Sequence, residues 1–229
     1  MTGPSSSSPA PPSLRSRSHS WTSVFGRACG VLLDTIVRWL ALSRINPNVL
    51  TFMGLVVNTW AAVLFGSANA ANQKRMFFYA GLVIIGSGFF DLVDGQVARA
   101  TNRVTRFGAF FDSVVDRYSD ASQFLGLLVF FARSDRFFYV VLTAFVMVSA
   151  IMVSYTRARA ESLIGSCRVG FMERPERLVL VIIGALFNRM APVLWVIAVL
   201  STITVIHRMR YTWTRTQDPP ATAQAGQAA

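Results

Sequence analysis

Long apolar segments, separated by short polar connections, constrain the fold of this chain more than any other feature of its sequence. A helix that crosses a bilayer needs roughly 20 predominantly apolar residues. Such segments lie at about 49–68, 76–98, 106–131 and 137–160, and a further apolar run covers 178–206. Only 14% of the residues are charged and 53% are hydrophobic, whereas about a quarter of the residues in a soluble domain are charged. The sequence therefore predicts an all-α, polytopic integral membrane protein.

Arg189 and Pro192 interrupt the apolar run 178–206. This favours a short fifth span, with Pro175 tolerated in its first turn, followed by a sixth span. A single long tilted helix is the alternative. At the start of the domain, Asn48 is a suitable N-cap for the first span, and Pro47 disfavours helix just before it. We therefore expect six transmembrane helices within residues 48–208.

The residues outside the spans predict an interfacial helix and two tails. Over residues 21–44, Arg27, Asp34 and Arg38 fall on one helical stripe, while apolar side chains occupy much of the rest. This pattern is typical of an amphipathic helix in the membrane interface, and the charges disfavour the alternative of a seventh span. Residues 1–20 are rich in Ser and Pro and lack the apolar core of a secretory signal. We expect disordered tails at 1–20 and 211–229, and one membrane domain over 21–210.

The net charge of +11 first suggests a partner with many phosphates, such as a nucleic acid. The basic residues, however, lie in short segments between the apolar runs, where Lys and Arg determine membrane orientation. One set of alternate segments carries most of the arginines, and the other set carries Lys74, Arg75, Arg133, Arg136 and Arg189. By the positive-inside rule, both termini face the cytoplasm, as in a bacterial-type inner membrane protein. We expect membrane lipids, and no nucleic acid, as partners.

Four regularly spaced aspartates lie where the second and third spans meet. Asp91 and Asp94 share one face near the end of the second span, and Asp112 and Asp116 continue a stripe from Gly108 in the third. A short connection makes these helices antiparallel neighbours, so the two pairs can face each other. Close carboxylate pairs repel by about 4 kcal/mol at an effective dielectric of 20. Divalent cations relieve this repulsion, and oxygen-only ligands favour Mg²⁺ or Mn²⁺, with two ions fitting four carboxylates better than one.

Small residues accompany the aspartates. Lacking long side chains, they permit close approach of a ligand, although ordinary helix packing is the alternative. Arg99 beside them could hold a phosphate. The amides at the start of the first span also favour anions, although a plain N-cap explains Asn48 equally well. The small residues are Gly95, Ala98 and Gly108, and the first span opens with Asn48 and Thr51.

The complete pattern Asp91-x2-Asp94-Gly95-x2-Ala98-Arg99-x8-Gly108-x3-Asp112-x3-Asp116 resembles the signature of the CDP-alcohol phosphatidyltransferases. The resemblance implies an interfacial helix before six spans. It also implies that a polar alcohol attacks the lipid-linked phosphate of a CDP-activated lipid, such as CDP-diacylglycerol, at the cytoplasmic face, with release of CMP. A homodimer is implied by the resemblance alone.

The resemblance also implies a role for each motif residue. The four aspartates would hold metal, and Asp116 would in addition be the general base that accepts the hydroxyl proton. Small and polar residues would surround the CMP moiety. The metal set is Asp91, Asp94, Asp112 and Asp116; the nucleotide set is Gly95, Ala98, Arg99 and Gly108, with Asn48 and Thr51 from the first span.

The acceptor alcohol is indicated by arginines outside the motif. Arg117 follows the proposed base inside a membrane helix, where a charge is costly and suggests a buried anionic partner. The stretches "DSVVDRYSD" and "RARAE…ERPERL" are similar to those of phosphatidylinositol-phosphate synthases, which implies inositol phosphate as acceptor. Glycerol 3-phosphate is the main alternative acceptor, and membrane topology together with contact to anionic headgroups is the alternative explanation of the arginines. The candidate phosphate-binding residues are Arg117, Arg157, Arg159, Arg174 and Arg177.

A different class of function, a cation or proton transporter, would use the aspartates as a relay. Such a relay predicts acidic residues at several depths in the membrane, and often internally repeated spans. Here the aspartates cluster at one connection, which disfavours this alternative. A noncatalytic scaffold is disfavoured too, since no structural requirement explains four converging aspartates.

Overall fold

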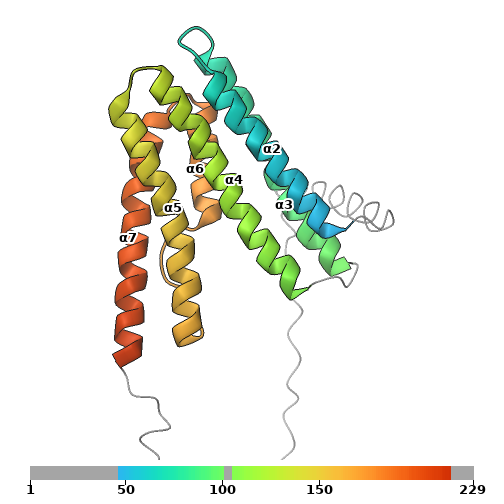
Figure 1. Cartoon of the computed structure of the whole chain (residues 1–229), viewed down its shortest axis with the longest axis vertical. Helices are drawn as coiled ribbons and strands as arrows, with labels where there is room; N and C mark the ends of the chain where they lie inside the picture. The colour runs from blue at the N-terminus through green and yellow to red at the C-terminus, as the bar shows by residue number, and fades with distance from the viewer. Residues whose placement is uncertain (1–45, 101–104, 218–229) are drawn as a thin grey trace, which may run out of the picture.

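The structure is a computed structural model that describes residues 46–100 and 105–217, and in these ranges it contains six α-helices and no strand (Figure 1). The predicted interfacial helix and the N-terminal tail lie outside the described residues. The all-helical prediction is confirmed for the described ranges, and α2, α5 and α7 are long and apolar enough to cross a membrane. The helices are α2 (Pro47–Ser67), α3 (Gln73–Ala100), α4 (Arg106–Arg133), α5 (Phe137–Ile164), α6 (Arg174–Leu186) and α7 (Met190–Gln217).

Helix α2 begins two residues earlier than its sequence suggests. Asn46, not Asn48, is the N-cap, and its side chain accepts a hydrogen bond from the Asn48 amide at 3.1 Å. Pro47 occupies the first helical turn, where the missing amide hydrogen costs nothing and the fixed φ suits the helix. The prediction of Asn48 as N-cap is therefore wrong, because proline restricts the residue before it and not itself.

A short connection separates α6 from α7, so the alternative of one long helix over 178–206 is wrong. Phe187 caps α6, and Asn188 takes a left-handed φ of 53° that a continuing helix does not permit. The Asn188 side chain accepts a hydrogen bond from Gln73 of α3 at 2.8 Å, which fixes the connection to the bundle. At its other end α7 continues to Gln217, so the expected boundary of the disordered tail at residue 211 is also wrong.

The helices form two groups joined through α4 and α6. Helix α2 packs on α3 and α4, while α5 packs on α7; α4 contacts α5, and α6 contacts both α3 and α7 (Figure 1). Helices α2 and α4 approach each other closely at Gly126. A Cβ added at Gly126 would lie 2.3 Å from the carbonyl oxygen of Ala62, so only glycine allows these two backbones to meet.

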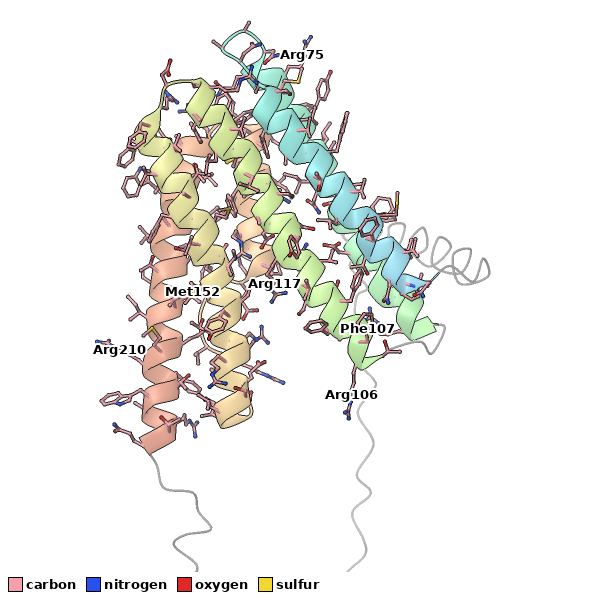
Figure 2. All side chains as sticks on the ribbon, in the orientation of Figure 1. Arg75, Arg106, Phe107, Arg117, Met152 and Arg210 are labelled. Carbon is pink, nitrogen blue, oxygen red and sulfur yellow. The ribbon has the colours of Figure 1, made fainter. Side chains whose placement is uncertain are left out.

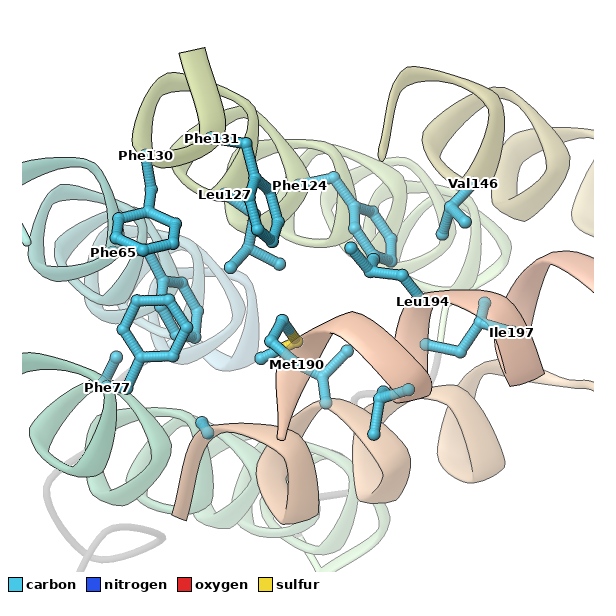
Figure 3. Packing of buried hydrophobic residues seen from close by; sticks show 14 of the residues in the cluster. Phe65, Phe77, Phe124, Leu127, Phe130, Phe131, Val146, Met190, Leu194 and Ile197 are labelled. Atoms are coloured by element: carbon cyan, nitrogen blue, oxygen red, sulfur yellow. The ribbon is translucent and has the colours of Figure 1, made fainter. Parts of the chain in front are cut away.

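An aromatic core fills the bundle at the end where α2 finishes and α3 begins. The Phe77 ring lies edge-on to Phe65 and to Phe130, at centroid distances of 5.0 and 4.9 Å. Leu194 and Ile197 of α7 are fully buried in the same cluster (Figure 3). Burying aromatic side chains in this way contributes most of the packing energy of such a core. The carboxylates near the end of α3 and the start of α4 lie at the other end of these helices.

Candidate active site

The centre of the candidate site is an arginine between two of the predicted aspartates. Nη1 of Arg174, in the first turn of α6, lies 2.9 Å from Oδ2 of Asp91 in α3 and 2.9 Å from Oδ1 of Asp116 in α4. All three side chains are mostly buried. Two carboxylates from different helices thus converge on one positively charged atom, as the stripe pattern predicts. The structure also brings Arg174, a predicted phosphate ligand, into direct contact with the predicted metal ligands.

A second, deeper ion pair lies one helical turn further along α4. Asp120 pairs with Arg177 of α6, whose side chain is almost fully buried, and lies 3.7 Å from Nε of Arg174. Within the described residues, Nε and Nη1 of Arg177 are buried and have no hydrogen-bond acceptor. Buried guanidinium donors are normally satisfied. Arg177 therefore retains unused capacity to donate to an anion.

Glu173, the N-cap of α6, ties both arginines to the rest of the bundle. Its amide donates to Oε2 of Glu176 at 3.1 Å, which completes a capping box. Its carboxylate pairs with Arg157 of α5 at 3.0 Å and with Arg208 of α7 at 2.8 Å. The start of α6 is thus held by charges from two other helices.

Arg208 is the most deeply buried member of this network, with its side chain 1% exposed. Its Nε donates to the carbonyl oxygen of Val169 at 2.8 Å, and its Nη1 donates to the carbonyl oxygen of Val153. Beside it, Thr204 accepts a hydrogen bond from the Met172 amide at 3.0 Å. The segment before α6 is therefore fixed along α7, and this arrangement determines where Arg174 and Arg177 lie.

The predicted nucleotide residues of α2 and α4 are neighbours in space. A Cβ added at Gly108 would lie 3.5 Å from Oδ1 of Asn48, and one added at Gly54 would lie 3.2 Å from Oδ1 of Asp91. The Thr51 hydroxyl is buried and donates to the carbonyl oxygen of Pro47 at 3.2 Å. The start of α2 therefore lies against both carboxylate-bearing helices. Since Asn46 is the N-cap, a role of Asn48 and Thr51 in ligand binding stays a prediction.

The remaining predicted residues differ in how far they enter the site. Arg99 is exposed on the last turn of α3, and the side chains of Asp94, Gly95 and Ala98 lie outside the described part of the chain. Arg117 lies beside the carboxylates, with Nη1 3.8 Å from Oδ2 of Asp116 (Figure 2).

The arginines of α5 divide between two places. Arg157 pairs with Glu161 and Glu173. Arg159 instead lines a separate groove between α5 and α7, beside Trp213. The structure therefore does not bring Arg159 to the carboxylates, and its predicted role in phosphate binding stays a prediction.

The carboxylates of the site are candidate ligands for a divalent cation. Among the side chains that the structure describes, no three acidic, histidine or cysteine groups lie close enough to hold a metal ion. Asp94, whose side chain is not among them, completes the predicted set. Asp91 and Asp116 do converge on the guanidinium of Arg174. Carboxylate oxygens are also the ligands that Mg²⁺ and Mn²⁺ prefer. The chemistry of the described donors thus fits a divalent cation that shares oxygens with Arg174.

Sequence reasoning missed three members of the site. Asp120 continues the spacing by fours from Gly108 through Asp112 and Asp116, so the helical period itself could have found it. Glu173 and Arg208 carry no such signal, because the contact between them joins residues far apart in the chain. An arginine after a long apolar run indicates a membrane boundary as readily as a buried ion pair.

Comparison with known proteins agrees with this geometry. The family model for CDP-alcohol phosphatidyltransferase matches residues 44–209. The archaetidylinositol phosphate synthase of Pyrococcus horikoshii is 36% identical over 77% of this chain and 88% of its own length. The crystal structure of Mycobacterium tuberculosis phosphatidylinositol phosphate synthase with CDP-DAG bound matches with a TM-score of 0.72 and 32% identity, covering 80% of this chain and 94% of that one.

A second crystal structure of the mycobacterial synthase, in complex with manganese and citrate, matches with a TM-score of 0.69 and 32% identity over 80% of this chain and 89% of that one. The range matched by the family model extends over most of the described helices and contains the positions of the aspartate pattern. The chain belongs to the CDP-alcohol phosphatidyltransferase family and is an enzyme of that class.

Proposed function

We propose that this enzyme transfers the phosphatidyl group of CDP-diacylglycerol to inositol phosphate and releases CMP. The observation that carries the proposal is the convergence of Asp91, Asp116 and Arg174 on one point. One substrate brings a pyrophosphate, which requires a cation held by the carboxylates. The other brings a phosphate monoester, which requires a positively charged side chain. Two of the relatives described above are named as synthases of inositol-phosphate lipids. The mycobacterial synthase has CDP-DAG bound in its crystal structure.

In this proposal Asp116 accepts the proton of the acceptor hydroxyl. The hydroxyl oxygen then forms a bond to the lipid-linked phosphorus, the bond from that phosphorus to the CMP oxygen breaks, and CMP leaves. Asp91, Asp94, Asp112 and Asp116 would hold the divalent cation, Mg²⁺ or Mn²⁺, which supplies charge neutralisation for the pyrophosphate. Manganese in the mycobacterial structure supports this choice of metal, and two ions suit four carboxylates better than one.

The acceptor phosphate is assigned to the arginines at the start of α6. Arg177 has buried donors without an acceptor in the described residues, and a phosphate monoester offers oxygens that match a guanidinium fork. Arg174 is shared between the carboxylates and this phosphate site. Arg117 and Arg157 lie at its edge, and glycerol 3-phosphate remains the alternative acceptor because it carries the same kind of phosphate.

The nucleotide is assigned to the face formed by α2 and the motif glycines. Asn48 and Gly108 lie close to each other across α2 and α4, and Thr51 follows one turn later. Together with Gly95, Ala98 and Arg99 of α3 they would surround the CMP moiety. The positive end of a helix dipole next to small residues is suited to a phosphate-bearing ligand.

The membrane arrangement completes the proposal. α2, α5 and α7 are apolar enough to span, and we infer that α3, α4 and α6 cross beside them, with their charged ends at the cytoplasmic face. The interfacial helix at 21–44 would lie against that face, with both termini in the cytoplasm. The enzyme is expected to act as a homodimer in the inner membrane.

The proposal is tested by CMP release from purified enzyme supplied with CDP-diacylglycerol, Mn²⁺ and separate acceptors. We expect release with inositol phosphate, and at least tenfold less with free inositol, which lacks the charge that the arginines would bind. Equal rates with both would reject the phosphate pocket. Faster release with glycerol 3-phosphate would reject inositol phosphate in favour of the alternative acceptor.

Arg117 provides a residue-level test of the same pocket. Arg117→Ala is expected to raise the KM for inositol phosphate about tenfold, the effect of one lost charge-assisted contact of about 1.4 kcal/mol, while the KM for CDP-diacylglycerol changes less than threefold. Arg106→Ala, at the start of the same helix and outside the ion-pair network (Figure 2), is the matched control. An equal rise in both KM values would reject the assignment.

A further inference from the structure

The end of the bundle opposite the aspartates contains a second polar pocket that the transfer reaction does not use. It encloses about 440 Å³ between the α2–α3 connection and the α4–α5 connection. Its polar lining comes from Asn69 and Gln73 on one side and from Arg133, Ser134 and Arg136 on the other. Helix α2, with 21 residues, separates the two ends of the bundle by roughly 30 Å at 1.5 Å per residue, which is the thickness of a bilayer core.

Both arginines of this pocket are held in place without a carboxylate. Arg133 donates from Nη1 to the carbonyl oxygen of Gly66 at 2.8 Å, and the guanidinium of Arg136 lies 5.5 Å from the centre of the Tyr139 ring. In the described ranges neither forms an ion pair. Asp135 lies between them in sequence but does not line the pocket. Each guanidinium is therefore oriented by its neighbours and keeps donors available for an anion.

The pocket walls are preformed by local hydrogen bonds. The Asn69 amide donates to Oδ1 of Asn72 at 2.8 Å, and Oδ1 of Asn69 accepts from the Ala71 amide at 3.0 Å. Gln73 is tied to Asn188. Across the pocket, the left-handed φ of 54° at Asp135 makes the turn that carries Arg136 back toward Arg133. An anion would enter a cavity that needs little rearrangement.

The surroundings of the pocket are those of a headgroup layer. Phe137 and Phe138, directly after Arg136, are 78% and 58% exposed, and Phe138 stacks on the half-exposed Trp195 at 5.7 Å. Exposed aromatic side chains at the end of apolar helices are typical of the membrane–water interface. Lys74 and Arg75 add positive charge to the same end (Figure 2). At this depth in the membrane, the phosphates of lipid headgroups are the anions next to a basic pocket.

We propose that Arg133 and Arg136 form a binding site for the phosphodiester of an anionic phospholipid, in the leaflet opposite the active site. The two guanidinium groups bind the phosphate oxygens, Asn69 and Ser134 complete the polar wall, and the acyl chains run along the exposed apolar surface beside Phe137. The lipid would thereby bridge the α2–α3 and α4–α5 connections and hold the two helix groups together.

The experiment measures lipid binding directly by native mass spectrometry of the full-length enzyme, titrated with phosphatidylglycerol or phosphatidylcholine. Arg133→Gln/Arg136→Gln should lose about 25-fold in phosphatidylglycerol affinity, since each basic group near a membrane surface contributes about fivefold. Lys74→Gln/Arg75→Gln removes the same charge from the same end outside the pocket and should lose less than threefold. CMP release in detergent should be unchanged in both variants, which also shows that they fold.

Several results would overturn the proposal. Equal losses in the two double variants would show a general charge effect and no pocket. Equal binding of phosphatidylcholine and phosphatidylglycerol by the wild type would exclude selection of an anionic lipid. Displacement of phosphatidylglycerol by an equal concentration of inorganic phosphate would identify a site for a free anion. If the double variant fails to fold, the single variant Arg136→Gln keeps the contact of Arg133 with Gly66. Its affinity for phosphatidylglycerol should still fall at least threefold. Wild-type affinity of this single variant would reject the site.

Discussion

The two halves of this bundle contribute mainly opposite charges to the candidate site, with Arg117 of α4 and Glu173 before α6 as exceptions. The half made of α2, α3 and α4 supplies Asp91, Asp116 and Asp120, and the half made of α5, α6 and α7 supplies Arg174 and Arg177. In the acidic half, helical spacing alone places the charges on one face. In the basic half the arginines reach the site only through Glu173 and Arg208, which join residues far apart in the chain. Local periodicity builds one half of the site, and tertiary contacts build the other.

The largest effect is expected from the acidic half. Asp116→Asn keeps the shape of the side chain but removes its capacity to accept a proton, so turnover should fall by about 10²–10⁴-fold, while CDP-diacylglycerol binding is retained. CMP release and binding of the CDP-lipid are measured on the same preparation. Asp135→Asn, which changes an exposed aspartate in the connection after α4, should be unchanged. Wild-type turnover of Asp116→Asn would reject the assignment of Asp116 as the general base.

The basic half is tested through its buried anchor. Arg208→Gln leaves two backbone carbonyls and part of Glu173 without a donor, which should cost about 3 kcal/mol of unfolding free energy. Thermal unfolding in detergent measures this cost. The acceptor KM should rise as well, because the start of α6 is no longer fixed. Arg210→Gln, one of the exposed arginines of the same helix (Figure 2), is the control; equal stability of the two variants would show that Arg208 does not anchor α6.

These two halves also differ in how much of them the sequence predicted. The aspartate stripe, the break near Arg189 and the all-helical class follow from helical period and hydropathy, both of which are local properties. The predicted N-cap Asn48 lies two residues after the observed one, because Pro47 disfavours helix only at Asn46 and itself occupies the first helical turn. Glu173 and Arg208 could not be predicted, because no spacing in the sequence relates a helix cap to an arginine 35 positions away.

A smaller effect, on the free energy of unfolding, is expected from the packing of α2 against α4 in the acidic half. Gly126→Ala would force α2 and α4 apart, because its Cβ would overlap the Ala62 carbonyl, and should cost about 2 kcal/mol. Gly86→Ala, where a Cβ meets nothing within 4 Å, gains the same helix propensity without the overlap. In the basic half, a Cβ at Gly184 meets only side-chain atoms, at 3.1 Å from Val193, so Gly184→Ala should cost less than Gly126→Ala. Thermal unfolding of the three variants checks this order, and a neutral Gly126→Ala would contradict the close approach of α2 and α4.

The most direct test of how the two halves meet is Mn²⁺ binding to wild type and to Arg174→Gln, measured by the loss of the free-ion EPR signal. Arg174 shares carboxylate oxygens with the proposed metal site, so removing its charge should strengthen Mn²⁺ binding by about tenfold. Asp91→Asn should weaken binding in the same assay. Unchanged or weaker Mn²⁺ binding by Arg174→Gln would contradict the proposal that Arg174 shares carboxylate oxygens with the metal. It would show that the arginine and the metal do not compete for the same carboxylates.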